Sequence, residues 1–334
     1  MSQVYLNNPL LKAAGVSIPF TSEQVEELIK CSKDPIYFIR NYCKIISLDK
    51  GLIDFELFGY QENFIKSMHN NNRVISMQPR QMGKTQTVAA YILHYVLFND
   101  HKTVAILANK KAASTEILSR FQLMYEHLPK WLQQGVVTWN KGDIELENGS
   151  KAFTAATSGA GIRGKSVNFL YVDEAAIIPN TVAEDFFTST YPTISSGKTT
   201  KIVLTSTPLG YNHFWKFWNE SGIGPNKNGF LPVEVKYWEH PDRDEAWANQ
   251  QKELLGDLKF NQEVLCAFLG SSLTLINSDT IARLSPASHI YSKDGLDIYE
   301  EPIKDHTYVM ICDTAKGVGG DYSAFSIIDV STVP

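Results

Sequence analysis

Residues 73–98 carry the strongest structural signal in the chain: they read Arg73-Val-Ile-Ser-Met-Gln-Pro-Arg-Gln-Met-Gly-Lys-Thr85, followed by Gln-Thr-Val-Ala-Ala-Tyr-Ile-Leu-His-Tyr-Val-Leu-Phe98. A short β-favouring run leads into a loop that ends in Gly-Lys-Thr, and apolar residues at helical spacing follow. This order of strand, loop and helix is the context of a phosphate-binding P-loop, in which backbone amides at the helix N-terminus face the phosphates. Lys84 would add a positive charge, and the Thr85 hydroxyl would bind Mg²⁺.

Two other segments also contain Gly-Lys-Ser/Thr, so their context has to decide between three candidate loops. In the usual pattern, Gly-x4-Gly-Lys-Ser/Thr, the first glycine is replaced here by Gln78, whereas residues 159–166 match in full. That segment and the Gly-Lys-Thr at 197–199 both lead straight into strand-like apolar runs, without the helix that a phosphate site needs. The predicted nucleotide-binding residues are therefore Gln78, Pro79, Arg80, Gln81, Met82, Gly83, Lys84 and Thr85.

Composition indicates a globular protein and limits its partners. With 334 residues, of which 43% are hydrophobic, the chain can bury one large core or two smaller ones. The four cysteines form no Cys-x-x-Cys pair, which indicates reduced thiols of a cytosolic protein. The sequence shows no secretion signal and no apolar run of membrane-spanning length. The net charge of −5 argues against electrostatic binding of nucleic acid by the whole chain, but leaves room for a local basic surface.

A second chemical signature is the apolar run Phe169-Leu-Tyr-Val, which ends in Asp173 and Glu174. At the tip of a strand, Asp173 would hold Mg²⁺ beside Thr85, and Glu174 would accept a proton from the water that attacks the γ-phosphate. The alternative is a strand that simply ends in solvated acids. The P-loop about one hundred residues upstream favours the catalytic interpretation, because both motifs can then lie at one sheet edge.

Two weaker motifs fit the same nucleotide site. The strand-like run that begins at Ile202 ends in Thr205, Ser206 and Thr207, whose hydroxyl groups could sense the γ-phosphate, although an ordinary polar strand end is the alternative. Upstream of the P-loop, Tyr60 could stack on adenine while Gln61 reads its edge. For Tyr60, a place in the ordinary core is the alternative interpretation.

The chain as a whole predicts an α/β fold of P-loop NTPase type, with a parallel sheet and helices on both faces. Asn148-Gly149 predicts a hairpin, and Thr21 or Ser22 and Pro35 indicate helix starts near the N-terminus. The expected parts are an N-terminal arm with helices belonging to a lid subdomain, an ATPase core, a small helical lid, a linker and an incomplete nuclease domain, at residues 1–50, 51–230, 231–275, 276–305 and 306–334.

These motifs together resemble the large terminase subunit of tailed bacteriophages, the ATP-driven motor that packages DNA into a procapsid. The P-loop without its first glycine, with Arg80 and Gln81, is similar to a variant found in that family. The other matching residues are Tyr60-Gln61, Asn148-Gly149-Ser150, Arg163-Gly164-Lys165-Ser166, Asp173-Glu174 and Thr205-Ser206-Thr207-Pro208. The resemblance implies that Arg163 reaches the γ-phosphate of a neighbouring subunit, whereas Arg80, inside the P-loop, acts on its own nucleotide.

The resemblance also implies the start of a ribonuclease-H-like nuclease domain that cuts DNA with acidic residues and a divalent metal. Residues 308–330 are similar to its first hairpin, with Asp313 as a metal ligand and Asp321 in the following loop. The remaining acidic ligands of the family would lie beyond residue 334. We therefore expect this truncated chain to hydrolyse ATP but not to cut DNA.

The implied cofactors are ATP and Mg²⁺, with Mg²⁺ or Mn²⁺ at a completed nuclease site. The implied partners are double-stranded viral DNA, the portal protein, the small terminase subunit and further copies of the chain in a ring on the procapsid, without a membrane. The expected location is the cytoplasm of the infected bacterial host, with transient attachment to the procapsid.

Two other classes share part of this pattern. A helicase or translocase of superfamily-2 type also combines a P-loop, an Asp-Glu strand and a Ser/Thr motif, but it needs a second α/β domain with an arginine-rich motif. The residues after Phe230 contain no such motif. An inactive nucleotide-binding remnant is the other alternative, and Glu174 argues against it because a pure switch does not need a positioned base.

Overall fold

The computed structural model describes residues 3–157, 162, 165–187, 197, 199–269, 289–293, 296–315 and 323–331. The chain divides into two compact units, Met1–Ser272 and Leu273–Pro334, and each is described by itself below. Among the described residues, no helix combines the length and the apolar character needed to cross a membrane.

The first unit is built on one sheet of eight strands. Their order is β10 (Leu231–Glu234), β3 (Arg73–Met77), β9 (Lys201–Ser206), β8 (Phe169–Val172), β4 (Thr103–Ala108), β7 (Lys151–Ala156), β6 (Asp143–Leu146) and β5 (Val136–Trp139). The strands from β10 to β7 pair in parallel, whereas β6 and β5 add an antiparallel edge, and the turn at Asn148 and Gly149 joins β6 to β7. This arrangement confirms the predicted parallel α/β sheet.

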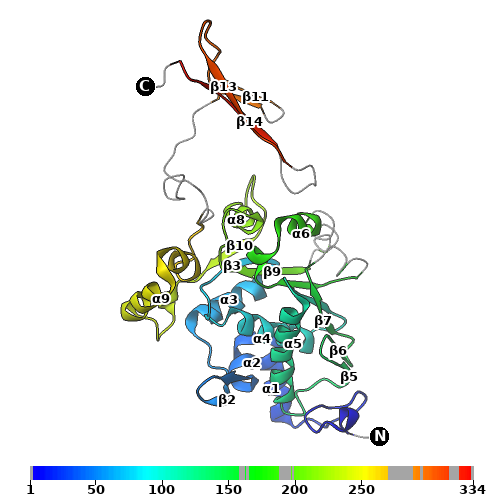
Figure 1. The fold of residues 1–334 in the computed structure, drawn as a ribbon. Coiled ribbons are helices and arrows are strands. Elements are labelled where there is room, and N and C mark those ends of the chain that lie inside the picture. The colour runs from blue at the N-terminus through cyan, green and yellow to red at the C-terminus, as the bar shows by residue number, and fades with distance from the viewer. Residues whose placement is uncertain are drawn as a thin grey trace. The chain divides into compact units, whose positions relative to one another are not determined.

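Helices cover both faces of this sheet (Figure 1). One face carries α1 (Ser22–Lys33), α2 (Pro35–Tyr42), α3 (Gly59–Asn70), α4 (Lys84–Leu97) and α5 (Lys111–Glu126), and the other carries α6 (Asn180–Asp185) and α8 (His213–Asn219). Strand residues alternate between the two sides, as the pleat requires. Val104 and Ile106 pack in the core cluster of α4 and α5, whereas Ala105 and Leu107 pack in the cluster that contains Phe214.

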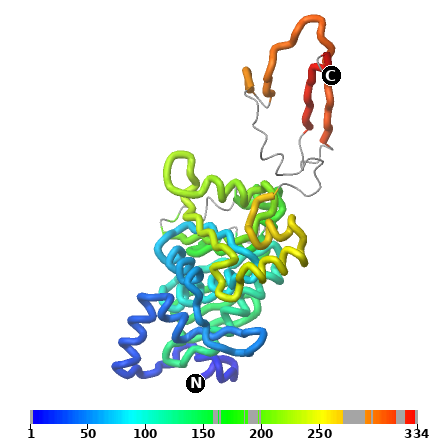
Figure 2. The backbone as a smooth tube through the Cα atoms, turned by 90° about the vertical axis from the view of Figure 1, so that its left-hand side faces the viewer, coloured from blue at the N-terminus to red at the C-terminus, as the bar shows by residue number. Residues whose placement is uncertain are grey.

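The N-terminal segment contributes residues to the core cluster that contains α4. After the short 3₁₀ helix η1 (Tyr5–Asn7), helix α1 is capped by Thr21, one of the two predicted caps, whose side chain accepts a hydrogen bond from the Gln24 amide. Figure 2 shows these helices in dark blue beside the rest of the main unit. Phe38 and Ile39 are fully buried in the α4 cluster. The sequence grouped residues 1–50 with a lid, whereas in the structure these helices pack on the core.

Two further elements of the main unit flank the P-loop. The hairpin of β1 (Lys44–Ser47) and β2 (Gly51–Asp54) lies just before α3. After β10, the 3₁₀ helix η4 (Tyr237–Glu239) leads into α9 (Glu245–Glu263), which is interrupted at Gly256. Its buried residues Ala248 and Phe260 form a small separate cluster with Val264. Strand β10 lies beyond the expected core boundary at residue 230 yet pairs with β3 in the main sheet.

The second unit contains two antiparallel hairpins. The first joins β11 (Tyr291–Lys293) to β12 (Leu296–Ile298), within the range that the sequence assigned to a linker. The second joins β13 (Tyr308–Asp313) to β14 (Ala324–Asp329), at the position of the predicted strand pair.

Candidate active site

The P-loop has the local order that the sequence predicted. Strand β3 ends at Met77, residues 78–83 form the loop, and α4 begins at Lys84. Gln81 (φ 60°) and Gly83 (φ 74°) both adopt left-handed backbone conformations. The positive φ of Gly83 favours glycine, and a Cβ atom there would lie 2.6 Å from Nε2 of Gln61, so the Gln61 side chain would have to move.

Asp173 is held at the end of β8 by three hydroxyl groups. Its Oδ1 accepts hydrogen bonds from the hydroxyls of Tyr171 (2.9 Å) and Thr205 (2.8 Å), and its Oδ2 accepts one from Thr85 (3.1 Å). The register of β8 and β9 explains why Asp173 and Thr205 lie close together. Tyr171 lies opposite Val203, and two residues further on, on the same face, Asp173 and Thr205 follow. Burial raises the pKa of Tyr171, so its hydroxyl keeps its proton and can donate a hydrogen bond.

The side chains of Thr85 and Asp173 are suitable ligands for Mg²⁺. Their side-chain oxygens lie 3.1 Å apart at the start of α4 and are of the hard type that Mg²⁺ takes in proteins. Asp173 is only 7% exposed, so its carboxylate faces the site rather than bulk solvent.

Glu174 follows in a left-handed conformation (φ 49°) that turns its side chain toward the P-loop. Its Oε1 lies 2.7 Å from Nζ of Lys84, forming an ion pair between the two motifs. The other oxygen, Oε2, is buried and has no hydrogen-bond partner within the described part of the chain. A carboxylate with one oxygen free of donors has the capacity that a general base needs.

The three hydroxyl residues at the end of β9 point to different surroundings. Thr205 contacts Asp173, whereas the Ser206 hydroxyl accepts a hydrogen bond from the Ala176 amide (3.1 Å), just beyond Glu174. The Ser206 carbonyl also accepts a hydrogen bond from the Gln78 amide (3.3 Å) in the P-loop. Thr207 is buried. Strand β9 therefore links the acidic residues to the loop.

Tyr60 and Gln61 lie against the P-loop backbone. The Tyr60 hydroxyl (3.0 Å) and the Gln61 amide (3.3 Å) both donate to the Met82 carbonyl. The Tyr60 ring is 4% exposed and stacks on Phe58, which matches the core alternative in this conformation. Their expected contact with adenine stays a prediction.

The remaining loop residues are anchored from outside. The Gln78 side chain donates to the Ser76 hydroxyl (2.8 Å), and Pro79 follows it. Nε of Arg80 lies 2.7 Å from Oε2 of Glu263 in α9, and this hydrogen bond raises the pKa of Arg80. In this structure Arg80 therefore pairs with α9.

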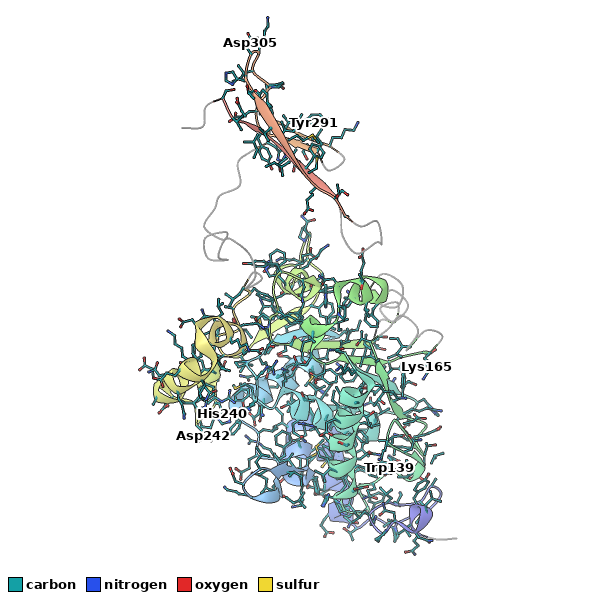
Figure 3. The ribbon with its side chains drawn as sticks, viewed as in Figure 1. Trp139, Lys165, His240, Asp242, Tyr291 and Asp305 are labelled. Atoms are coloured by element: carbon teal, nitrogen blue, oxygen red, sulfur yellow. The ribbon has the colours of Figure 1, made fainter. Side chains whose placement is uncertain are left out.

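Three of the predicted site residues lie outside the described part of the main unit. Arg163 and Asp321 lie outside the described residues. Lys165, near Arg163 in sequence and labelled in Figure 3, has its Nζ 3.8 Å from the centre of the Phe153 ring. Asp313 ends β13 in the second unit, so its expected nuclease role stays a prediction.

Three residues that contact the site were not predicted from the sequence. Tyr171 could have been found by strand alternation, because it precedes Asp173 by two residues on the same face. Arg243 and Glu263 reach the P-loop from more than 160 residues away in sequence and carry no local signal.

A cavity of about 700 Å³ opens beside the P-loop, between it and the β1–β2 hairpin. Its lining includes Phe58, Tyr60, Gln61, Gln81, Met82, Gly83, Gln86, Arg120 and His240. His240, labelled in Figure 3, lies with its ring 4.7 Å from that of Phe58. A second cavity of about 560 Å³, between the N-terminal arm and the end of α4, is lined by no predicted site residue.

Comparison with known proteins places the chain in a family. Residues 75–283 match the family model of the terminase large subunit, T4-like-virus type, N-terminal part. The large terminase subunit of Thermus phage G20c is 25% identical over 312 residues, which cover 83% of this chain and 62% of that protein. The subunit of Thermus virus P23-45 matches with the same identity and coverage. The chain thus spans about 62% of the length of these relatives.

Solved structures show the same fold. A mutant ATPase domain of the large terminase of Thermus phage P74-26 superposes with a TM-score of 0.54 at 20% identity, covering 64% of this chain and 95% of that one. The large terminase of a thermophilic bacteriophage in complex with ADP superposes with a TM-score of 0.52 at 12% identity, covering 83% and 66%. Because the family match includes the P-loop, the acidic pair and β9 and extends over more than half of the chain, this protein belongs to the large terminase subunit family of T4-like type.

Proposed function

We propose that the chain is the ATP-hydrolysing motor part of a large terminase, which drives double-stranded viral DNA into a procapsid. One observation carries the enzymatic part of this proposal. The Asp173 carboxylate joins Thr85 of the P-loop to Thr205 of β9, beside the Lys84–Glu174 ion pair. This arrangement combines a phosphate-binding loop, oxygen ligands for a metal and a base.

Binding of ATP would use the loop and the start of α4. Backbone amides of the P-loop and the Lys84 ammonium would contact the phosphates. Thr85 and Asp173 would hold Mg²⁺, which, when bound, neutralises charge on the phosphate oxygens. Tyr60 and Gln61, at the neighbouring cavity, would lie on the adenine side of the site.

Hydrolysis would depend on Glu174. When Lys84 turns to the phosphates, Glu174 Oε1 loses its partner, and the carboxylate can then accept a proton from the attacking water. The water oxygen forms a bond to the γ-phosphorus, while the bond to the oxygen shared with the β-phosphate breaks, leaving ADP and phosphate. Arg80, on its own nucleotide, and Arg163, on that of a neighbouring copy, would stabilise the developing charge.

Thr205 and Ser206 would transmit the nucleotide state, since β9 contacts both Asp173 and the Gln78 amide. Membership of this family supports our proposal of the remaining partners: viral DNA, the portal protein, the small terminase subunit and further copies of the chain in a ring. The motor would work in the cytoplasm of the infected bacterial host and on the procapsid. The similarity to the thermophilic bacteriophage enzyme, whose structure contains ADP, supports ATP as the nucleotide.

Mutation of the P-loop lysine and of the base tests this proposal. We expect Lys84→Ala to abolish ATP binding and hydrolysis, because it removes the phosphate-binding charge. Glu174→Gln should bind ATP normally yet turn over about 10²–10⁴-fold more slowly, because only the base is lost. Steady-state ATPase assays with and without DNA, combined with calorimetry, measure both effects.

The control for this experiment is Lys198→Ala, at the Gly-Lys-Thr that we interpret as a turn. Activity within a few-fold of wild type is expected for it. Normal turnover by the Lys84→Ala variant would refute the assignment of the loop. If the Glu174→Gln variant lost as much ATP affinity as the Lys84→Ala variant, the role of Glu174 as the base would be refuted.

A further inference from the structure

Three successive carbonyl groups of the P-loop are held by side chains from outside the loop. Nη1 of Arg243 donates to the Arg80 carbonyl (3.1 Å), and its Nη2 donates to the Gln81 carbonyl (2.8 Å). The third carbonyl, that of Met82, accepts from Tyr60 and Gln61. We call Arg243, Tyr60 and Gln61 the outer clasp.

The outer clasp determines where the amides of the loop point. The described residues contain no cis peptide bond, and in a planar trans peptide the C=O and N–H groups point in opposite directions. Carbonyls held on the outer side therefore direct the amides of Gln81, Met82 and Gly83 to the inner side. Among the described residues, none of these three amides donates a hydrogen bond to the backbone.

Arg243 is itself rigidly placed. It is 8% exposed, and its guanidinium lies 4.6 Å from the centre of the Trp247 ring. Its amide donates to the His240 carbonyl (3.1 Å), and the next residue, Asp244, caps α9. Within the described residues no carboxylate pairs with it. It donates to the two loop carbonyls and, through Nη1, to the Met82 sulfur (3.1 Å), all uncharged acceptors, so its charge adds to the positive potential behind the loop.

The loop conformation needs such support. Gln81 adopts a left-handed conformation that is unfavourable for a residue with a side chain, and it lies between the two carbonyls that Arg243 holds in place. Without the guanidinium, the peptide units at Arg80 and Gln81 could rotate and turn their amides away from the phosphate side.

We propose that Arg243 is a positioning residue for the nucleotide site, which preorganises the P-loop amides for phosphate together with Tyr60 and Gln61. This inference rests on the proposed ATPase function and adds a residue to it. Apparent affinity falls in proportion to the fraction of molecules with a binding-competent loop. Loss of Arg243 should therefore weaken phosphate binding, while turnover at saturating ATP is largely kept because Lys84, Asp173 and Glu174 remain.

The experiment measures binding of ADP and of inorganic pyrophosphate to the full 334-residue chain by calorimetry. Arg243→Gln should raise both Kd values by a similar factor, about tenfold or more, because pyrophosphate contacts only the loop. Arg243→Lys should be intermediate, since one ammonium cannot hold both carbonyls in the same geometry. The control is Lys252→Gln, which removes an exposed cation of α9 that pairs with Asp257, and it should bind as wild type does.

Two further measurements distinguish positioning from general stability. The KM for ATP should rise in the Arg243→Gln variant with kcat within about threefold of wild type. Amide exchange of residues 78–85 without nucleotide should be faster, at an unchanged melting temperature. If Arg243→Gln fails to fold, Tyr60→Phe replaces it. That variant removes one donor to Met82 and should raise both Kd values about threefold.

Unchanged Kd values for Arg243→Gln, or for Tyr60→Phe in its place, would overturn this inference alone. A loss of kcat at unchanged Kd would also overturn it, because it would assign a catalytic role instead. If wild type bound neither ADP nor pyrophosphate and matched Lys84→Ala, the proposed function itself would fail, and the role of Arg243 with it.

Discussion

Strands β8 and β13 have the same kind of sequence, an apolar run that leads to an aspartate, but very different surroundings. All four residues of β8, Phe169 to Val172, are completely buried between two parallel neighbours. In β13, Met310 and Ile311 are each 57% exposed, and the strand pairs only with β14 among the described residues.

The aspartates at the two strand ends differ accordingly. Asp173 receives hydrogen bonds from three hydroxyl groups on β8, β9 and α4. Asp313 lies opposite Ala324, whose side chain offers no donor. An apolar strand that ends in an acid therefore becomes a site only through its neighbours. Local sequence alone does not distinguish the two.

The largest expected effect concerns these aspartates. Asp173→Asn should lower ATPase activity about 10³-fold and weaken Mg²⁺-dependent ATP binding, because it removes charge beside Thr85. Asp313→Asn should leave ATPase activity within about twofold of wild type. Titrations of activity against Mg²⁺ measure both variants. Equal losses of ATPase activity in the two variants would show that Asp173 has no special role at the nucleotide site.

A second prediction compares the stability of the strands. Leu170→Ala in β8 should lower the free energy of unfolding by about 2–5 kcal/mol, because it leaves a cavity in a closed core. Met310→Ala in β13 should change it by less than about 0.5 kcal/mol. Urea unfolding followed by far-UV circular dichroism measures both variants, because this signal arises from helices and strands of both units. A large effect of Met310→Ala on this signal would contradict the contrast.

The two units should also differ in their response to acid. Burial in α4 lowers the pKa of His94 to about 4 in the folded chain, from 6.5. Between these values the unfolded state binds a proton that the folded state does not, so stability falls as the pH falls from 6.5 to 4. The loss should reach roughly 2 kcal/mol between about pH 7 and about pH 5.

Urea unfolding at the two pH values tests the role of His94. His94→Gln should reduce the difference between them, since glutamine does not titrate. His306→Gln is the control, because His306 lies in the second unit and pairs with Asp329. An unchanged pH dependence in the His94→Gln variant would exclude this histidine as the cause.

The smallest expected effect concerns the tyrosine that distinguishes β8 from an ordinary apolar strand. Tyr171→Phe removes one of two donors to Asp173 Oδ1 and should raise the Mg²⁺ concentration for half-maximal activity about tenfold. Tyr308→Phe in β13 should have no such effect. If Tyr171→Phe lowered stability without changing the Mg²⁺ requirement, the tyrosine would be a packing residue only.

Elements with local signals can be predicted from the sequence alone. The helix after Gly83, the strand before Asp173 and the turn at Asn148 and Gly149 follow from hydrophobic period and turn chemistry within a few residues. The helix start at Thr21 or Ser22 follows from the same kind of local signal, and the structure gives Thr21 as the cap. Parallel packing followed from the alternation of strands and helices along the chain.

The distant residues that complete the site come together through tertiary packing. Arg243 meets Gln81 across 162 positions, and Thr205 meets Asp173 across 32, distances over which no local periodicity persists. Strand β10 pairs with β3, and the N-terminal helices pack in the cluster of α4. Both arrangements depend on which apolar faces pack together during folding. Burial and hydrogen bonding are properties of the assembled neighbourhood, so a sequence window that predicts a strand cannot predict what will hold its last residue.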